Sequence, residues 1–289
     1  MTELISTIVQ GILIGGLYAL FAAGLSLVFG IMRVVNLAHG DLIVAGSFVG
    51  FACVNTLGLH PMFALLLTPV VMAGAGYALQ RTILNPTIGQ DILPPLLVTF
   101  GVSIILQNAL LQLFSADNRK ISLGGLETSS LKIGEGIAVG WYSVIVFICS
   151  ILVIFGLQMI SNRTRIGRAF RAAADDADIA RLMGVRTSHV FGLAMALALA
   201  ICGIAGVLFA IWTSFTPLSG PGRLLIAFEV IVIGGIGSIW GTLIGGIVLG
   251  LAQAIGGYFN PGWQTLAGHI AFIAILMYWP RGLWMGRRK

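Results

Sequence analysis

Few charged side chains lie inside the long apolar runs of this sequence, and those that do are the first candidates for contact with a solute. Glu229 is the only acid in the interior of a predicted membrane span. A charge at that depth is costly, so it normally faces a cavity or a partner. Glu229 is therefore a candidate for the pathway of a polar solute. Its structural alternatives are pairing with Arg223 or capping of a broken helix.

Amide side chains interrupt another apolar run at Gln107, Asn108 and Gln112. Asn108 and Gln112 are four residues apart and so share one face of a helix. These amides either line the same pathway or hold neighbouring helices together. A third polar group, Asn36, His39 and Asp41, follows the first apolar run. It is a candidate gate or inner cap, since Asp41 can cap the next helix and Asn36 can bond the backbone.

Motifs for catalysis or for a metal ion are missing from the sequence. It contains no GxxxxGK[ST] phosphate loop, no HExxH and no GxSxG. His39, His60, His189 and His269 are scattered at predicted helix ends, and the three cysteines stand singly in apolar runs. We assign no catalytic residue and no metal ligand. A lipid-modifying enzyme is a third functional class, but no residue pattern supports it.

The elements that position these residues are membrane helices. Apolar residues make up 58% of the 289 positions and charged residues 9%, whereas soluble domains carry about 25% charge. Several apolar runs are near the roughly 20 residues that cross a bilayer as a helix. The sequence predicts an all-α, polytopic transmembrane helix bundle that forms one domain over residues 1–289. The expected segments are 5–30, 41–58, 62–82, 93–115, 141–160, 189–213, 224–234, 238–257 and 264–280.

The stretch near 224–241 is too long for one span and short for two, so we expect eight or nine membrane segments with one short or broken helix there. Gly234, Gly235 and Gly237 supply the backbone freedom for the break. Small residues four apart recur at Gly11 and Gly15, at Gly46 and Gly50, and along 194–210. They predict close helix packing within the chain, with use as a subunit interface as the alternative.

Basic residues set the orientation. The connection 161–188 holds six arginines and belongs in the cytoplasm, and alternation then places 12 of the 16 basic residues inside. With nine crossings the N-terminus is outside and the C-terminus inside, whereas a re-entrant segment at 224–234 changes the side of one end. The formal charge of +6 therefore reflects topology and lipid contact, not nucleic acid. The external loop 116–140 carries mixed charge and is a reasonable landing surface for an external protein. Its charged residues are Asp117, Arg119, Lys120, Glu127, Lys132 and Glu135.

The connection 161–188 looks too ordered for a simple linker. Its alanines favour helix, Asp175, Asp176 or Asp178 can cap a second short helix, and Gly184 can close it. Ala173, Ala177, Ala180 and Gly184 would form a face small enough for a partner's groove. A docking element is the sharper interpretation, and a basic loop that only sets topology is the alternative.

Three segments resemble one family. The run TRIGRAFRAAADDADIARLMGV at 164–185 resembles the cytoplasmic loop of permease subunits in high-affinity branched-chain amino acid importers of the ABC class. The run GIMRVVNLAHGD at 30–41 is similar to the family's link between its first two helices, and IGGIGSIWG at 233–241 is similar to its glycine-rich late segment. The likeness runs in order over nearly the whole chain and is greatest to LivH-type subunits.

The resemblance implies a transport subunit without its own ATPase site, located in the bacterial cytoplasmic (inner) membrane. It implies as partners a second related permease, two cytoplasmic ATPase subunits that use ATP and Mg²⁺, and an external solute-binding protein. No cofactor is expected on this chain. The implied ATPase-coupling residues are Arg168, Arg171, Asp175, Asp176, Ala177, Asp178, Arg181 and Gly184. The competing function is a self-sufficient, ion-coupled secondary transporter with Glu229 as its ion site.

Overall fold

The computed structural model describes residues 2–89, 91, 93–125, 127, 129–132 and 138–284. Glu135, Arg287, Arg288, Lys289 and the side chain of Lys132, which entered the predictions above, lie outside this description. The elements are α1 (Thr2–Met32), α2 (His39–Asn55), α3 (Pro61–Leu79), α4 (Leu93–Phe114), β1 (Ser130–Lys132), β2 (Ala138–Gly140), α5 (Trp141–Arg163), α6 (Arg165–Asp175), α7 (Ala177–Leu182), α8 (Thr187–Trp212), α9 (Gly220–Gly234), α10 (Ile239–Phe259) and α11 (Gln264–Tyr278).

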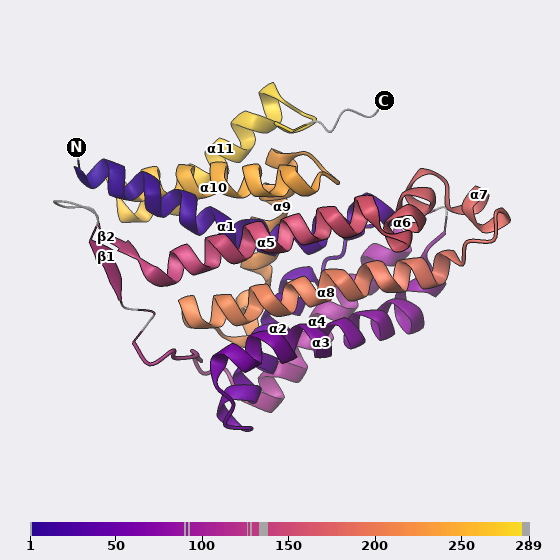
Figure 1. Cartoon of the computed structure of the whole chain (residues 1–289), viewed down its shortest axis with the longest axis horizontal. Helices are drawn as coiled ribbons and strands as arrows, with labels where there is room; N and C mark the ends of the chain where they lie inside the picture. The colour runs from indigo at the N-terminus through magenta and orange to yellow at the C-terminus, as the bar shows by residue number, and fades with distance from the viewer. Residues whose placement is uncertain are drawn as a thin grey trace.

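Long helices lie side by side along one axis and define two ends of the molecule (Figure 1). The β1–β2 hairpin and the start of α1 lie at one end, and α6 and α7 lie at the other. Since the basic connection 161–188 contains α6 and α7, we refer to these as the outer and inner ends. Within the described residues, seven helices are long and apolar enough to cross a membrane, and α2 is a shorter apolar helix. The prediction of a polytopic helical membrane protein is confirmed.

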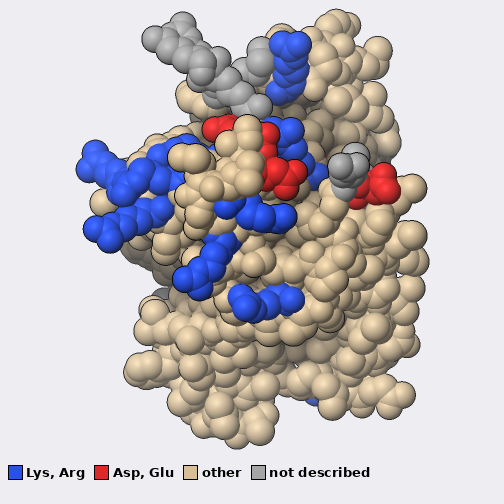
Figure 2. Space-filling model, turned by 90° about the vertical axis from the view of Figure 1, so that its right-hand side faces the viewer, with Lys and Arg blue, Asp and Glu red and all other residues tan. Residues whose placement is uncertain are grey.

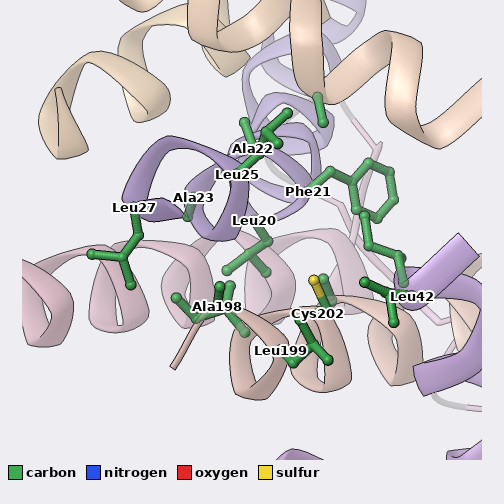
Figure 3. Packing of buried hydrophobic residues seen from close by; sticks show 14 of the residues in the cluster. Leu20, Phe21, Ala22, Ala23, Leu25, Leu27, Leu42, Ala198, Leu199 and Cys202 are labelled. Atoms are coloured by element: carbon green, nitrogen blue, oxygen red, sulfur yellow. The ribbon is translucent and has the colours of Figure 1, made fainter. Parts of the chain in front are cut away.

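The centre of the bundle is formed by α1 and α8, whose most apolar stretches are 83% and 78% buried inside the chain. Side chains of α1, α2 and α8 interdigitate there (Figure 3). Phe21 of α1 meets Phe209 of α8 edge to face, with ring centroids 5.8 Å apart. By contrast, the corresponding stretches of α3, α4 and α5 are about one-fifth buried. These three helices are peripheral and present side chains to lipid or to partner subunits.

Glycines set the closest helix contacts. A Cβ on Gly15 of α1 would lie 2.6 Å from the carbonyl oxygen of Gly246 in α10, and one on Gly46 of α2 would lie 2.9 Å from that of Cys202 in α8. Backbones approach this closely only where side chains are absent, and the gain is van der Waals contact. The predicted packing seams are confirmed as contacts within one chain.

Two helices, α2 and α9, begin inside the bundle. The backbone is not helical at 33–36 before α2, and a short turn at Pro217–Ser219 precedes α9. The two helix N-termini meet, because a Cβ on Gly40 would overlap the Gly220 carbonyl. From there α2 runs outward and α9 runs inward. The sequence analysis anticipated a short helix near 224–234 but not this junction.

The predicted break lies where the glycines placed it, between α9 and α10. Gly235 and Gly237 have φ values of 100° and 79°, which glycine adopts without steric cost. The chain near its C-terminal end returns to this point. The N–H groups of Leu283 and Trp284 donate to the carbonyls of Ile233 and Gly234 at 2.8 and 3.2 Å. Backbone groups that α9 leaves unpaired at its end are thereby satisfied.

Candidate functional site

A buried polar cluster lies at the junction of α2 and α9. Asp41, in the first turn of α2, is 2% exposed. Its carboxylate accepts hydrogen bonds from the Ser103 hydroxyl at 2.5 Å and from the Gln107 amide at 3.0 Å. Ser103 and Gln107 are one turn apart on α4 and so present both donors on one face. We call Asp41, Ser103 and Gln107 the polar centre.

The polar centre is deep within the bundle. The His39 ring nitrogen Nε2 lies 2.8 Å from the carbonyl oxygen of Phe21. Phe21 precedes the inner end of α1 at Met32 by 11 residues, which is about 16 Å of helix. The polar centre therefore lies near the middle of the membrane layer.

Helix dipoles account for an acid at this depth. Each helix N-terminus carries about half a positive charge, and the N-termini of α2 and α9 meet here. Asp41 lies against Gly220, the first residue of α9, so its carboxylate faces the N-termini of both α2 and α9. No salt bridge to Asp41 occurs among the residues that the structure describes. The negative charge of Asp41 is instead stabilised by the two helix N-termini and by the hydrogen bonds from Ser103 and Gln107.

The sequence analysis was partly wrong about Asn36, His39 and Asp41. They were expected at the inner end, but all three are at most 2% exposed inside the bundle. Asp41 does not cap α2, whose N-terminus lacks a side-chain cap. Asn36 does bond the backbone, since its Oδ1 accepts from the Ala38 N–H at 3.0 Å. The pattern of apolar runs showed where the first span ends, but not that the next segment turns back inside.

The amides of α4 divide between two environments. Gln107 is partly buried at the polar centre, whereas Asn108 and Gln112 are exposed. Asn108 donates to the Ile104 carbonyl of its own helix at 2.8 Å. The neighbouring Ile104 and Ile105 are 45% and 69% exposed. The face of α4 that points away from the bundle thus carries both apolar and amide side chains within the membrane layer.

Glu229 lies in a second cluster, away from the amides. It is 1% exposed and bonds His269 of α11. Both structural alternatives for Glu229 were wrong. It does not pair with Arg223, whose guanidinium carbon instead lies 4.3 Å from the centroid of the Phe209 ring. Nor does it cap the broken helix, since Leu283 and Trp284 bond the end of α9. On the adjoining helices, the Tyr18 hydroxyl of α1 donates to Gln253 of α10 at 2.7 Å. His269, Tyr18 and Gln253 were missed, since their partners are distant in sequence.

The inner end carries the two short helices predicted in the connection 161–188. Thr164 caps α6 through the Gly167 N–H at 3.0 Å. Asp176 caps α7 by accepting from the N–H groups of Asp178 and Ile179, both at 2.9 Å. Gly184 ends the loop with a φ of 86°. Of the three aspartates named as caps, Asp176 is the one that serves.

The surface that α7 offers is apolar. Ile179, Leu182 and Met183 are 59%, 87% and 80% exposed at its tip. By contrast, Ala173 and Ala180 are buried within the chain and Ala177 is partly buried. The small-residue face expected to meet a partner therefore packs largely on this chain's own bundle. These three apolar side chains were not among the predicted contacts, which were charged or small residues.

One residue joins the inner surface to the junction of α2 and α9. Arg33 follows α1 and donates from its guanidinium to the Ala174 carbonyl of α6 at 3.2 Å. Its φ of 54° is unusual for a side chain other than glycine. The segment that begins at Arg33 leads through Asn36 to α2. Arg33 thus links α6 to the stretch of chain that leads into α2.

The two ends differ in charge. Figure 2, which views the inner end, shows Lys and Arg gathered over that face with few acids among them. At the outer end, Glu127 organises a turn of the loop. The pKa of its carboxyl lies below the ordinary 4.5, because the carboxylate accepts hydrogen bonds from backbone N–H groups and from the Ser122 hydroxyl. The N–H groups are those of Glu127 itself, Leu123 and Gly125.

Among the residues that the structure describes, no three His, Cys, Asp or Glu side chains are grouped to hold a metal ion.

Comparison with known proteins gives a consistent result. A family model described as "Branched-chain amino acid transport system / permease component" matches residues 7–278. The chain is 31% identical to the high-affinity branched-chain amino acid transport system permease protein BraD of Pseudomonas aeruginosa, over 97% of this chain and 95% of BraD. In Salmonella typhimurium it matches two permease proteins of that system. These are LivH (30% identity, over 96% of this chain and 94% of LivH) and LivM (26%, over 92% and 67%).

Proposed function

Because the chain belongs to the family of permease components of branched-chain amino acid transport systems, we propose that it forms one half of the membrane pathway of an ATP-driven importer for these amino acids. The chain is a transport subunit, and the ATPase is a separate subunit. It belongs in the bacterial cytoplasmic membrane. A related second permease completes the pathway, as the likeness to both LivH and LivM supports.

The exposed apolar tip of α7 is the observation that carries this proposal. Leu182 and Met183 project from the end of the molecule where the basic residues gather. Exposed apolar side chains on a capped helix fit the mode in which a helix is bound in a groove. The ATPase subunits dock here, where they hydrolyse ATP with Mg²⁺. The coupling residues Arg168, Arg171, Asp175, Asp176, Ala177, Asp178, Arg181 and Gly184 belong to this surface or hold its shape.

The solute pathway runs along the face of α4 that points away from the bundle. Lipid offers no hydrogen-bond partner to the Gln112 amide or to the side-chain oxygen of Asn108, so we expect a second permease or water to face them. A branched aliphatic zwitterion needs a wall that is partly apolar and partly polar, which Ile104 and Asn108 offer together. Gln107 connects this wall to the polar centre. We leave Glu229 out of the pathway, because it is buried and bonded to His269 of α11.

Docking is tested by co-purification of the complex from native membranes. The double variant Leu182→Ser with Met183→Ser should lose the ATPase subunits while the second permease stays bound. Asp176→Ala should have the same effect, because α7 loses its N-terminal cap. Leu57→Ser is the matched control, since Leu57 is 63% exposed at the outer end. Retention of the ATPases by both inner variants would contradict the docking assignment.

The pathway is tested by cross-linking between the two permeases. Cysteine at position 108 should cross-link to the second permease. Cysteine at position 148 should not, since Ile148 is 52% exposed on α5, which packs on α1. The reverse pattern would move the pathway to the α5 side.

The competing function, an ion-coupled secondary transporter, is separated by reconstitution. The purified chain alone should transport nothing. Uptake driven by an ion gradient without any ATPase would establish the alternative.

A further inference from the structure

A basic cavity opens at the inner end between α3 and α8, beside the docking surface, with which it shares Gly184. Its volume is about 670 Å³, and Tyr77, Arg81, Arg186, Ser188 and His189 are among its lining residues. No acidic residue lines it. Neither arginine forms a salt bridge among the described residues. The cavity thus holds uncompensated positive charge.

Hydrogen bonds hold the side chains of the cavity in place. The Arg81 guanidinium donates to the Tyr77 hydroxyl at 3.3 Å, and that hydroxyl lies 2.8 Å from Nδ1 of His189. The remaining N–H groups of Arg81 and those of Arg186 are left to bind a ligand. Guanidinium groups are among the usual ligands of phosphate oxygens.

The positions of Tyr77 and Arg81 place the cavity at the level of the membrane surface. They are one turn apart at the inner end of α3, where a π-helical turn (Gln80–Leu84) widens the helix. Such turns occur frequently at functional sites. The Tyr77 ring is fixed against α8, because a Cβ on Gly192 would lie 2.8 Å from it. Tyrosine and arginine at the inner membrane surface are typical neighbours of lipid headgroups.

An apolar stripe continues from the cavity into the membrane layer. Leu66, Val70, Gly74 and Tyr77 follow one another at helical spacing on α3. Leu66 and Val70 are 70% and 68% exposed. A Cβ on Gly74 would meet nothing within 4 Å, so the stripe is hollowed there. A lipid acyl chain can pack along such an apolar stripe, whereas an acidic side chain of a soluble partner would make no contact with it.

We propose that this cavity binds the phosphate headgroup of an anionic phospholipid from the cytoplasmic leaflet, with one acyl chain along Leu66, Val70 and Gly74. Arg81 and Arg186 hold the phosphate oxygens, with Tyr77 and His189 beside them. The proposal does not rest on the proposed transport function, because neither arginine belongs to the docking tip or to the pathway.

The test is the lipid retained by the full complex in nanodiscs of equal parts phosphatidylethanolamine and phosphatidylglycerol, measured by native mass spectrometry. Arg81→Gln and Arg186→Gln should each lower the affinity for phosphatidylglycerol about ten-fold or more, as expected for the loss of a hydrogen bond to a charged group. Arg163→Gln removes the same charge from the exposed end of α5 and should lower retention clearly less, since it removes only general attraction to the anionic surface. Gly74→Leu fills the stripe without altering charge and should also weaken retention.

Three outcomes would overturn the proposal. One is equal lipid loss in Arg163→Gln, which would reduce the effect to net charge. Another is unchanged retention in Gly74→Leu, which would leave a phosphate site without an acyl groove. The last is loss of the ATPase subunits from Arg81→Gln and Arg186→Gln with lipid retention intact. That result would assign the cavity to an acidic surface of the ATPase.

Discussion

At the scale of single residues, two carboxylates are each stabilised by specific hydrogen-bond donors. Asp41 is held by two side chains and two helix ends inside the membrane layer, and Glu127 by backbone N–H groups in water. Removal of either carboxylate therefore leaves donors without an acceptor. The cost is expected to be larger at Asp41, since buried unpaired groups cannot turn to water.

A double-mutant cycle tests the polar centre. Asp41→Ala leaves the Ser103 hydroxyl buried without an acceptor, and we expect a loss of about 1–3 kcal/mol per unsatisfied group. Ser103→Ala in addition removes that unpaired group, so the double variant should be more stable than the sum of the single losses predicts. The thermal midpoint of the purified complex is the measurement. Strict additivity would mean that the two side chains do not interact.

The Glu127 turn should weaken in acid. Its carboxyl has a lower pKa when the turn is formed than when it is open. The turn is therefore stabilised above pH 4.5 and loses that stabilisation as the pH falls through the lowered pKa. Because the activity of pepsin itself depends on pH, the measurement is the rate at which pepsin cleaves the outer loop of the parent relative to Glu127→Gln at each pH. That ratio should rise toward one as the pH falls below 4.5 and the Glu127 carboxylate takes up its proton, since Glu127→Gln has no proton to gain. Equal pH profiles for both would contradict this account.

At the scale of elements, α2 and α9 depend on the absence of side chains where they meet. Gly40→Ala would force a Cβ into the Gly220 carbonyl, and overpacking of a tight contact costs about 1–3 kcal/mol or more. We expect low yield and a lowered thermal midpoint. Gly156→Ala on α5 is the control, since its Cβ would meet nothing within 4 Å. A Gly40→Ala variant as stable as the control would show that the junction is looser than described.

Arg33 should couple α6 to α2. Arg33→Gly keeps the φ of 54° accessible but removes the bond to Ala174. If that bond transmits motion, the reconstituted complex should hydrolyse more ATP per amino acid imported than the parent does. Uptake and hydrolysis are measured in the same vesicles. An unchanged ratio would exclude Arg33 from coupling.

Elements were predictable to the extent that apolar runs and glycines determine them. The break at Gly235 and Gly237 and the seams at Gly15 and Gly46 follow from local backbone needs. The depth of Asp41 does not, because hydropathy gives the end of a run but not the path of the chain after it. Nor does the bond of Glu229 to His269, since it joins residues on different helices. The exposure of Leu182 was not predictable either, because an apolar residue in a short amphipathic helix usually faces its own protein.

At the scale of the whole molecule, orientation decides the function. A chain with its native cysteines Cys53, Cys149 and Cys202 replaced by alanine can carry a single new cysteine at Asp178 or at Ser122. In right-side-out vesicles, an impermeant thiol reagent should label position 122 and spare position 178 until the membrane is opened. Labelling of position 178 in sealed vesicles would place α7 outside and remove the basis for ATPase docking.

The segment that covers the end of α9 has a consequence for biosynthesis. The carbonyls of Ile233 and Gly234 find their partners only at Leu283 and Trp284, fifty residues later along the chain. While the ribosome adds α10 and α11, these acceptors stay open near the cytoplasmic surface. We therefore expect nascent chains stopped before Leu283 to be inserted yet remain targets of membrane quality-control proteases, and chains that have emerged past Trp284 to escape them.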